Sequence, residues 1–470
     1  MPQENARPYP PRRRRRRRRI NPTAIIFWLV VVLIILGIVA LAVSCSGPEQ
    51  KEEEPSPSTE PTQGIVQQTK PDPTTEPTTE STAPTEPPIT QTGSATISAT
   101  GDILMHMPCV RPGAQGDGTY DFTGYFPYLQ PYVEKADYSV ANLETTLAGL
   151  EGGYEYSGYP NFNCPDGIVT TLQEVGFDML LTANNHTYDT QTLGFFRTQQ
   201  VIEEYGMDHI GTKTSLDVPD YLIREIDGIR IGMICYTYET NADPYNVALN
   251  GGANLKENEK DLINTFMKDD VLGFSQDLAQ DIADMEADGA EAIVLYIHWG
   301  EEYQLKQNSQ QEAMAQAACD LGVDVIVGGH PHVIQPIDLL TSQTDPQHKT
   351  VCLYSTGNAL SNQKLGNISS VKTAHTEDGI LFSFSFAKYS DGTVRVEGVD
   401  ALPLWINYYT GSTPYDILPL DENVTDWAAT LDLDSWTLTK AEASFDRTME
   451  IIGDGLEEVQ THLDALPPIQ

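Results

Sequence analysis

Apolar residues from position 94 onward fall into short runs that alternate with amphipathic stretches. The short runs are typical of buried strands: ATISAT, YSVANL, FDMLLTAN, RIGMICY, EAIVLYIHWG, VDVIVGG and TVCLYST. The stretches between them predict helices that end at or beside glycine: PDGIVTTLQEVG, TLGFFRTQQVIEEYG, SQDLAQDIADMEADG and QQEAMAQAACDLG. This alternation indicates an α/β layered domain, which we place at residues 94–420. Residues 421–470 are predicted to form an acidic helical tail.

The longest apolar segment precedes this domain, at residues 23–43. Its 21 uncharged residues are enough for a helix to cross the hydrocarbon core of a bilayer, about 30 Å thick. An arginine run, Arg12–Arg19, stands before it. Such a run also occurs in nucleic-acid patches, but beside an apolar span it favours a cytoplasmic N-terminus. We therefore expect a cytoplasmic tail at 1–22, a transmembrane helix at 23–44 and an extracellular domain.

A cleaved secretory signal is the alternative to this anchor, because Cys45 could be a site of lipid attachment. In either case the domain is tethered outside the cell membrane. Residues 45–93 are dominated by Pro, Thr, Glu and Ser, with almost no large apolar side chain. Such a segment cannot bury enough surface to offset the entropy lost on ordering, so we predict a disordered linker there.

The formal charge of the chain is -39, and it is unevenly distributed. Residues 1–20 hold nine of the basic residues and one acidic residue, which leaves 19 basic and 66 acidic residues, a net charge of -47. A body this acidic repels nucleic acid, so we expect no nucleic-acid partner. The six cysteines form no CxxC pair. Cys109 could bridge Cys164 outside the cell, although sequence alone cannot establish the pairing.

Polar residues with metal-binding chemistry follow five of the predicted strands. They are Asp102 and His106, Asn142 and Glu144, Asn184, Asn185, His186 and Asp189, His298, and His330 and His332. Carboxyl ends of parallel strands meet at one edge of a sheet, so these side chains are expected to converge. A bridging carboxylate, an amide oxygen and several imidazoles can hold two divalent ions that share and polarise a water molecule.

Each of these strand ends also has an ordinary explanation, such as a hydrogen-bonded histidine or a turn that caps a helix. Their number in a chain with nine histidines favours a metal site. Other catalytic motifs are missing: the sequence has no GxSxG elbow, no P-loop, no HExxH and no Gly-rich dinucleotide fingerprint.

Six segments, spread over residues 96–400, resemble the CapA family, the capsule synthesis proteins associated with poly-γ-glutamate. They are GDILMH, NLETTLAG, ANNHTYD, HWGEEY, GGHPHVIQ and YSTGN. The resemblance implies a calcineurin-like metallophosphoesterase fold, a four-layer αββα sandwich. It also implies metal ligands at Asp102, Glu144, Asn185, His298, His330 and His332, and His186 as the catalytic histidine that protonates a leaving oxygen.

This chain departs from the wider metallophosphoesterase pattern at two positions. His106, which we include among the candidate ligands, stands four residues after Asp102 where the pattern has two, and Glu144 replaces an aspartate. The count of ions, one or two, and their identity among Mn, Fe, Zn and Mg are therefore left open. Asn184, Glu302 and Tyr303 are expected to contact substrate.

The function expected from these features is a membrane-anchored, extracytoplasmic, metal-dependent hydrolase or transfer factor. Its expected substrate is an anionic cell-envelope polymer such as poly-γ-glutamate. The alternative is a non-catalytic component that binds the polymer, or takes part in its export, with other capsule synthesis proteins of the membrane.

Overall fold

The computed structural model describes residues 88–240, 246–408, 415–421 and 433–466. The predicted cytoplasmic tail and membrane anchor, and nearly all of the predicted linker, lie outside these residues. Within the described parts of the chain, no helix is long and apolar enough to cross a membrane. Pro84–Gln470 forms a compact unit by itself.

The first of two large sheets has eight strands in the order β17-β16-β15-β1-β2-β3-β4, with β14 beside β1. Strands β1 to β4 are parallel, whereas β15, β16 and β17 are antiparallel to their neighbours. The strands are β1 (Gln91–Ile103), β2 (Tyr138–Leu143), β3 (Met179–Leu181), β4 (Asp208–Ile210), β14 (Asn358–Leu360), β15 (Asp378–Tyr389), β16 (Val394–Asn407) and β17 (Asp416–Pro419).

The second sheet has seven strands in the order β12-β13-β11-β10-β6-β5, with β9 beside β6. Its central strands are parallel, and β5 and β12 run antiparallel at the two edges. The strands are β5 (Tyr221–Ile226), β6 (Ile229–Glu239), β9 (Thr265–Met267), β10 (Ala292–His298), β11 (Val325–Gly329), β12 (Ile337–Thr341) and β13 (Lys349–Leu353). A separate hairpin pairs β7 (Ala248–Leu249) with β8 (Ala253–Asn254).

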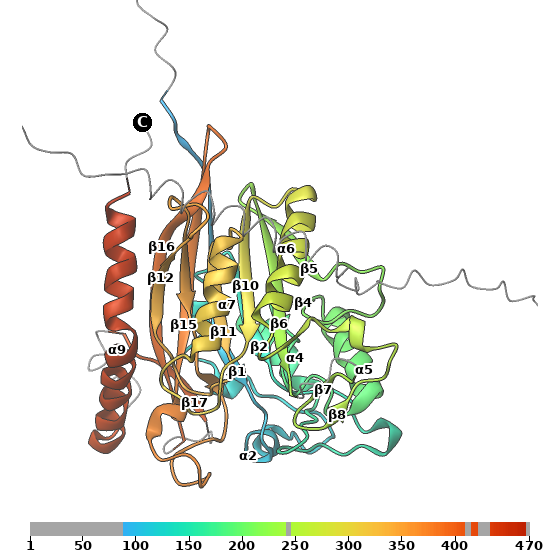
Figure 1. Cartoon of the computed structure of the whole chain (residues 1–470). Coiled ribbons are helices and arrows are strands. Elements are labelled where there is room, and N and C mark those ends of the chain that lie inside the picture. Colours follow the sequence, from blue (N-terminus) through green and yellow to red (C-terminus); the bar gives the residue numbers. More distant parts are fainter. Residues whose placement is uncertain (1–87, 241–245, 409–414, 422–432, 467–470) are drawn as a thin grey trace, which may run out of the picture. The chain divides into compact units, whose positions relative to one another are not determined.

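The two sheets pack face to face through alternate apolar residues of their strands. Ile97 of β1 and Val140 of β2 share one buried cluster with Met233 of β6 and Val294 of β10. Helices cover the outer faces (Figure 1). They are α4 (Gly167–Val175) and α5 (Gln191–Glu204) on the first sheet, and α6 (Val271–Ala287) and α7 (Ser309–Asp320) on the second, with short helices α2 (Met107–Val110) and α3 (Gln130–Val133) in loops. The predicted α/β class is confirmed, with layers in the order helix, sheet, sheet, helix.

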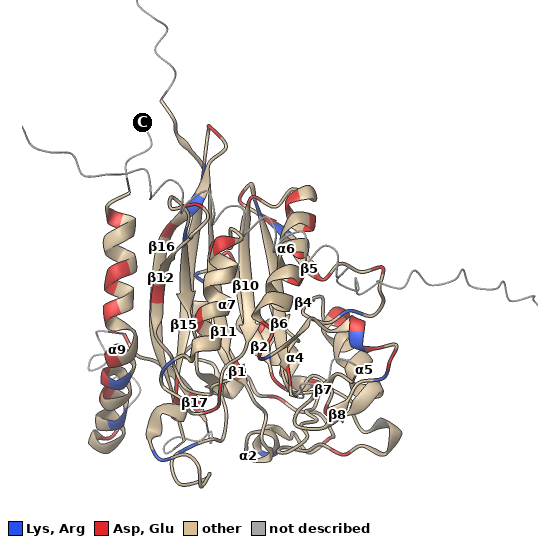
Figure 2. Cartoon of the chain, in the orientation of Figure 1, with Lys and Arg blue, Asp and Glu red and all other residues tan. Residues whose placement is uncertain are grey.

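The helix predicted near the C-terminus is α9 (Ser435–Asp464), which runs beside β16 and β12 (Figure 1). Its buried face contributes Ile452, Val459 and Leu463 to the cluster between the sheets. Arg447 pairs with the buried carboxylate of Asp378 at 2.7 Å. Figure 2 shows acidic residues along α9, and Glu442, Glu450 and Asp454 among them are exposed. The helix therefore packs against the edges of both sheets.

The cysteines of the described domain are all buried free thiols, at positions 109, 164, 235, 319 and 352. The Cys109 to Cys164 bridge considered from the sequence is not formed in this structure. Burial raises the pKa of Cys109 to about 12, so this thiol stays protonated and unreactive at neutral pH.

Gly455→Ala is expected to lower the free energy of unfolding by about 1–3 kcal/mol, because the site has no room for a methyl group. A Cβ at Gly455 would lie 1.8 Å from the carbonyl oxygen of Ile337 in β12, whereas a Cβ at Gly453 would lie 3.9 Å from its nearest neighbour. The control Gly453→Ala should gain up to about 1 kcal/mol from helix propensity. Urea unfolding measures both; equal stabilisation by both variants would mean that α9 does not pack on β12.

Candidate metal centre

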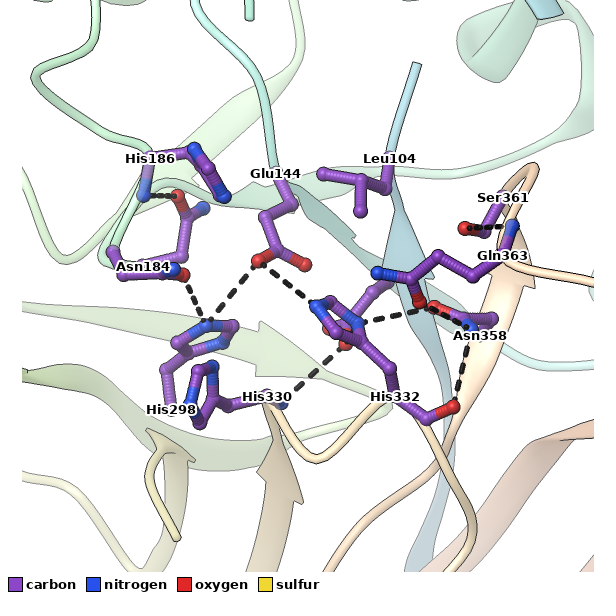
Figure 3. A network of polar contacts seen from close by, with 12 residues as sticks. Leu104, Glu144, Asn184, His186, His298, His330, His332, Asn358, Ser361 and Gln363 are labelled. Atoms are coloured by element: carbon purple, nitrogen blue, oxygen red, sulfur yellow. Dashed lines mark hydrogen bonds and ion pairs between the residues drawn. The ribbon is translucent and has the colours of Figure 1, made fainter. Parts of the chain in front are cut away.

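The predicted ligands converge where parallel strands of both sheets end. Asp102 is the second-to-last residue of β1, and Glu144 and Asn185 follow β2 and β3. From the second sheet, His298 ends β10, and His330 and His332 follow β11. None of the six is more than 5% exposed. Figure 3 shows Glu144 between His298 and His332. The convergence expected from the strand ends is therefore present.

The loop after β11 aims both of its histidines through unusual backbone conformations. His330 has φ 96° and His332 has φ 55°, both in the left-handed region that non-glycine residues rarely adopt. Gly328 lets this segment approach β13, because a Cβ there would lie 2.0 Å from the carbonyl oxygen of Tyr354. Strain of this kind costs about 1–3 kcal/mol per residue and clusters at functional sites. The spacing His-Pro-His thus directs two rings to different parts of one centre.

Two groups of ligand atoms share Glu144. One consists of Glu144, His298 and His330, and the other of Asp102, Glu144 and His332; within each group the atoms lie within 4.8 Å of one another. His298 Nε2 and His332 Nε2 lie 3.5 and 3.9 Å from Glu144 Oε1. His332 Nδ1 lies 3.0 Å from Asp102 Oδ2. Glu144 therefore occupies the position of a bridging carboxylate.

Hydrogen bonding within the protein leaves this centre unsatisfied. Both carboxylate oxygens of Glu144 and Nδ1 of His330 are buried and have no hydrogen-bond partner. An unpartnered buried polar group costs about 1–3 kcal/mol, and more when it is charged. Carboxylate oxygens and imidazole nitrogens are common ligands of Zn, Fe and Mn. The residues present therefore fit a divalent metal ion.

Burial and neighbouring charges shift the pKa values of this group in opposite directions. Burial and the charge of Asp102 raise the pKa of Glu144 to about 8. Burial lowers the pKa of His298 to about 3 and that of His330 well below its ordinary value. Burial opposes protonation of His332 too, but Glu144 and Asp102 outweigh it and raise its pKa to about 9. At neutral pH, His298 and His330 are therefore neutral, as metal ligands must be, whereas an ion that bound Glu144 and His332 would displace a proton from each.

The two asparagines after β3 differ in what they contact. Asn185 Oδ1 lies 2.8 Å from His298 Nε2, among the candidate ligands. The Asn184 amide donates to the carbonyl oxygen of Leu143 at 2.9 Å and accepts from the backbone N–H of His186 at 3.1 Å. Asn184, predicted to bind substrate, is thus buried and holds the loop that presents Asn185 and His186.

His186 has a fixed orientation beside the ligand groups. Its Nδ1 lies 2.7 Å from Asp189 Oδ2, and its ring makes an edge contact with Phe162 at 4.7 Å between centroids. Asp189 also accepts hydrogen bonds from the backbone N–H of Phe162 and from the side chain of Asn250, each at 2.7 Å. The carboxylate of Asp189 holds the imidazole at Nδ1, and Nε2 is the nitrogen left for chemistry.

The remaining predicted residues lie at the border of the centre. His106 is outside both ligand groups, and its Nδ1 lies 3.2 Å from the carbonyl oxygen of Leu104 and 3.3 Å from the backbone nitrogen of Asn362. Glu302 is exposed, and the ring of Tyr303 lies 6.3 Å from that of His332. Their roles as ligand and substrate contacts stay predictions.

The sequence analysis missed Tyr238, which contacts the ligand histidines, and Lys268, which contacts Tyr238. Tyr238, near the end of β6, lies with its ring 4.7 Å from His330 and 6.4 Å from His298, nearly parallel to the latter at 4°. Lys268, directly after β9, has its Nζ 4.2 Å from the Tyr238 ring centroid. Neither type is a usual metal ligand, so a search for ligand chemistry at strand ends passes over both.

Glu144→Gln is expected to stabilise the metal-free protein increasingly as pH rises toward 8. The pKa of Glu144 is raised from 4.5 to about 8 on folding. Between these values the folded protein keeps a proton that the unfolded chain has released. The free energy of unfolding of the wild type therefore falls by up to about 1.4 kcal/mol per pH unit. The Glu144→Gln variant lacks this contribution, because glutamine does not titrate. Urea unfolding with a chelator, at about pH 5 and about pH 8, measures it; a pH-independent difference would contradict it.

Comparison with known proteins gives the family of the chain. Residues 96–363 match the family model described as "Bacterial capsule synthesis protein PGA_cap". The chain is 28% identical over 279 residues to the capsule biosynthesis protein CapA of Bacillus anthracis, covering 57% of this chain and 60% of that protein. It is 25% identical over 277 residues to the PGA biosynthesis protein CapA of Bacillus subtilis (strain 168), covering 58% and 64%. The chain thus aligns with less than two thirds of the length of either relative.

Two solved structures are more distantly similar. One, described as a 5'-nucleotidase from Staphylococcus aureus in complex with alpha-ketoglutarate, has a TM-score of 0.39 and 13% identity, covering 74% of this chain and 58% of that one. The other, the sulfate thiohydrolase SoxB of Thermus thermophilus in complex with glycerol, has a TM-score of 0.36 and 14% identity, covering 76% and 60%. The match of the family model over more than half of the chain, which agrees with the CapA resemblance of its motifs, shows that this protein belongs to the bacterial capsule synthesis family PGA_cap.

Proposed function

We propose that this protein is a metal-dependent hydrolase of capsule biosynthesis that acts on an anionic cell-envelope polymer. The observation that carries the proposal is that Glu144, which belongs to both ligand groups, has two buried carboxylate oxygens without a hydrogen bond. A structural carboxylate in this position would have acquired donors from its surroundings. A carboxylate left without them suits a site that is completed by cations.

Glu144, His298 and His330 would hold one divalent ion, with Asn185 nearby, and Asp102, Glu144 and His332 would hold a second. When bound, such ions supply Lewis acidity and lower the pKa of water. The protein supplies the orientation. Asn142 donates to Asp102 Oδ1 at 2.7 Å, and Asn358 Oδ1 lies 3.2 Å from His332 Nδ1. These contacts fix the orientation of both ligand side chains.

His186 would transfer the proton. With Nδ1 held by Asp189, its Nε2 carries or releases a proton at the side of the centre that Phe162 borders. We assign it the role of general acid that protonates the leaving group of the polymer. Phe162 is buried, so its ring keeps water from this side of the imidazole.

The polymer we favour is poly-γ-glutamate, because the chain belongs to a capsule synthesis family and one relative is described as a PGA biosynthesis protein. Incubation of the purified full chain with this polymer tests the proposal, with Mn²⁺ or a chelator. The expected result is that the polymer becomes shorter with Mn²⁺ and not with the chelator. Binding of the polymer without cleavage at any metal loading would instead favour a binding or export component.

We also propose that residues 23–44 anchor the protein in the cell membrane with the domain outside. The support is the uncharged segment behind Arg12–Arg19. Protease added to intact cells with an accessible envelope is expected to release a soluble fragment cut within residues 45–93. Full protection of the protein under conditions that digest a known surface protein would contradict this topology.

A further inference from the structure

Lys268 lies at the same sheet edge as the ligand histidines, although it follows a different strand. Strand β6 lies between β10 and β9 and runs parallel to both. In the register of these strands His298 is opposite Thr237, and Tyr238 is opposite Phe266. Lys268 comes directly after the last residue of β9. Strand order alone therefore brings its side chain to the carboxyl ends that carry the metal ligands.

The contacts of Lys268 hold its ammonium group near the candidate centre. Its Nζ lies 4.2 Å from the ring centroid of Tyr238, and that ring lies 4.7 Å from His330. On its other side Nζ lies 2.9 Å from Glu301 Oε1 and 3.4 Å from the carbonyl oxygen of Gly300, in the loop that follows His298. The ammonium and a ligand histidine therefore contact the same aromatic ring.

The ion pair of Lys268 is exchangeable. The side chains of Lys268 and Glu301 are 31% and 58% exposed, and exposed pairs contribute little to stability. An oxyanion of a substrate can therefore replace Glu301, while the cation–π contact with Tyr238 keeps the ammonium in position. Asp102 and the exposed Glu302 bring negative charge to the centre. The ammonium of Lys268 adds positive charge at this edge of the sheet, which favours a substrate anion.

We propose that Lys268, supported by Tyr238, binds an oxyanion of the substrate at the candidate metal centre and so determines its specificity for anionic polymers. This inference rests on the proposed function. The oxyanion is a carboxylate of the polymer or a phosphate group, since both present the same chemistry to a lysine.

Binding of two probes to the purified full chain tests this role. The probes are inorganic phosphate and a γ-linked glutamate oligomer, titrated calorimetrically on Mn²⁺-loaded protein. Lys268→Met is expected to weaken binding of at least one probe on the order of 10- to 100-fold, as expected for the loss of a charged hydrogen bond. Lys268→Arg should restore most of the affinity. If Lys268→Met loses affinity for phosphate alone, the site is a phosphate subsite. If it loses affinity for the oligomer alone, the site is a carboxylate subsite.

Lys388→Met is the matched control. Lys388 is 27% exposed and pairs with Glu291, but it lies on β15 opposite Gly93, near the start of β1 and away from the ligand end. This control should bind both probes as the wild type does. The metal content of the wild type and of each variant is measured separately. Wild-type protein without bound metal would contradict the proposed function. Wild-type protein that binds neither probe, or equal binding by Lys268→Met and the wild type, would overturn the role of Lys268.

Discussion

Replacing His330 and His332 together by alanine is expected to remove most of the divalent metal that the protein binds. His330 belongs to one ligand group and His332 to the other, so the double variant deprives each group of an imidazole. The carboxylates and His298 that remain cannot complete two sites of about four ligands each. Elemental analysis of the purified full chain after dialysis measures the bound metal.

The single variants separate the two groups. His330→Ala should lose metal from the group with His298, and His332→Ala from the group with Asp102, so each is expected to retain part of the content. His375→Ala with His462→Ala is the matched double control, because both histidines lie outside the two groups. Unchanged metal in the double variant His330→Ala, His332→Ala, with unchanged circular dichroism, would show that these residues bind no metal.

Sequence could predict the convergence of these side chains because it depends on local signals. Each candidate follows a short apolar run, and parallel strands with intervening helices bring such positions to one edge. The central place of Glu144 could not be predicted in the same way. It depends on the first sheet facing the second, which places a residue after β2 within 3.5 Å of one at the end of β10.

Lys268 and Tyr238 could not be predicted because their contact also depends on how distant segments pair. Lys268 follows a strand of three residues, β9, which is too short to give a periodic signal. Its neighbour in the sheet is β6, far earlier in the chain, so no local pattern reports the contact with Tyr238. Likewise the sequence predicts α9 as a helix, but its position depends on Gly455, which meets the backbone of β12 closely.

His106 and Asn184 show that residue type alone does not decide which atoms are available to a ligand or substrate. His106 and Asn184 have the chemistry of a ligand and of a substrate contact, and both lie near the centre. Yet the Asn184 amide is engaged by Leu143 and His186, and His106 Nδ1 faces the backbone of Leu104 and Asn362. Spacing along the chain places a side chain near a site, whereas its neighbours decide which of its atoms remain available.

His186→Asn is expected to lower turnover by about 10²- to 10⁴-fold, the usual contribution of a general acid. Asparagine keeps a polar group of similar length near Asp189 but cannot deliver a proton to a leaving group. His186 is outside both ligand groups, so the bound metal should remain. Turnover of poly-γ-glutamate, and of an activated phosphodiester, measures the loss, and elemental analysis checks the metal.

Asp189→Asn is the companion variant, and it separates orientation from proton transfer. The carboxylate lies 2.7 Å from His186 Nδ1, and an amide there favours the wrong tautomer or ring orientation. We expect Asp189→Asn to lower turnover, as His186→Asn does. The two losses should not add, because both variants disable one imidazole. Full additivity in the double variant would mean that Asp189 acts independently of His186. Turnover by His186→Asn equal to that of the wild type, with metal retained, would show that the proton comes from another group.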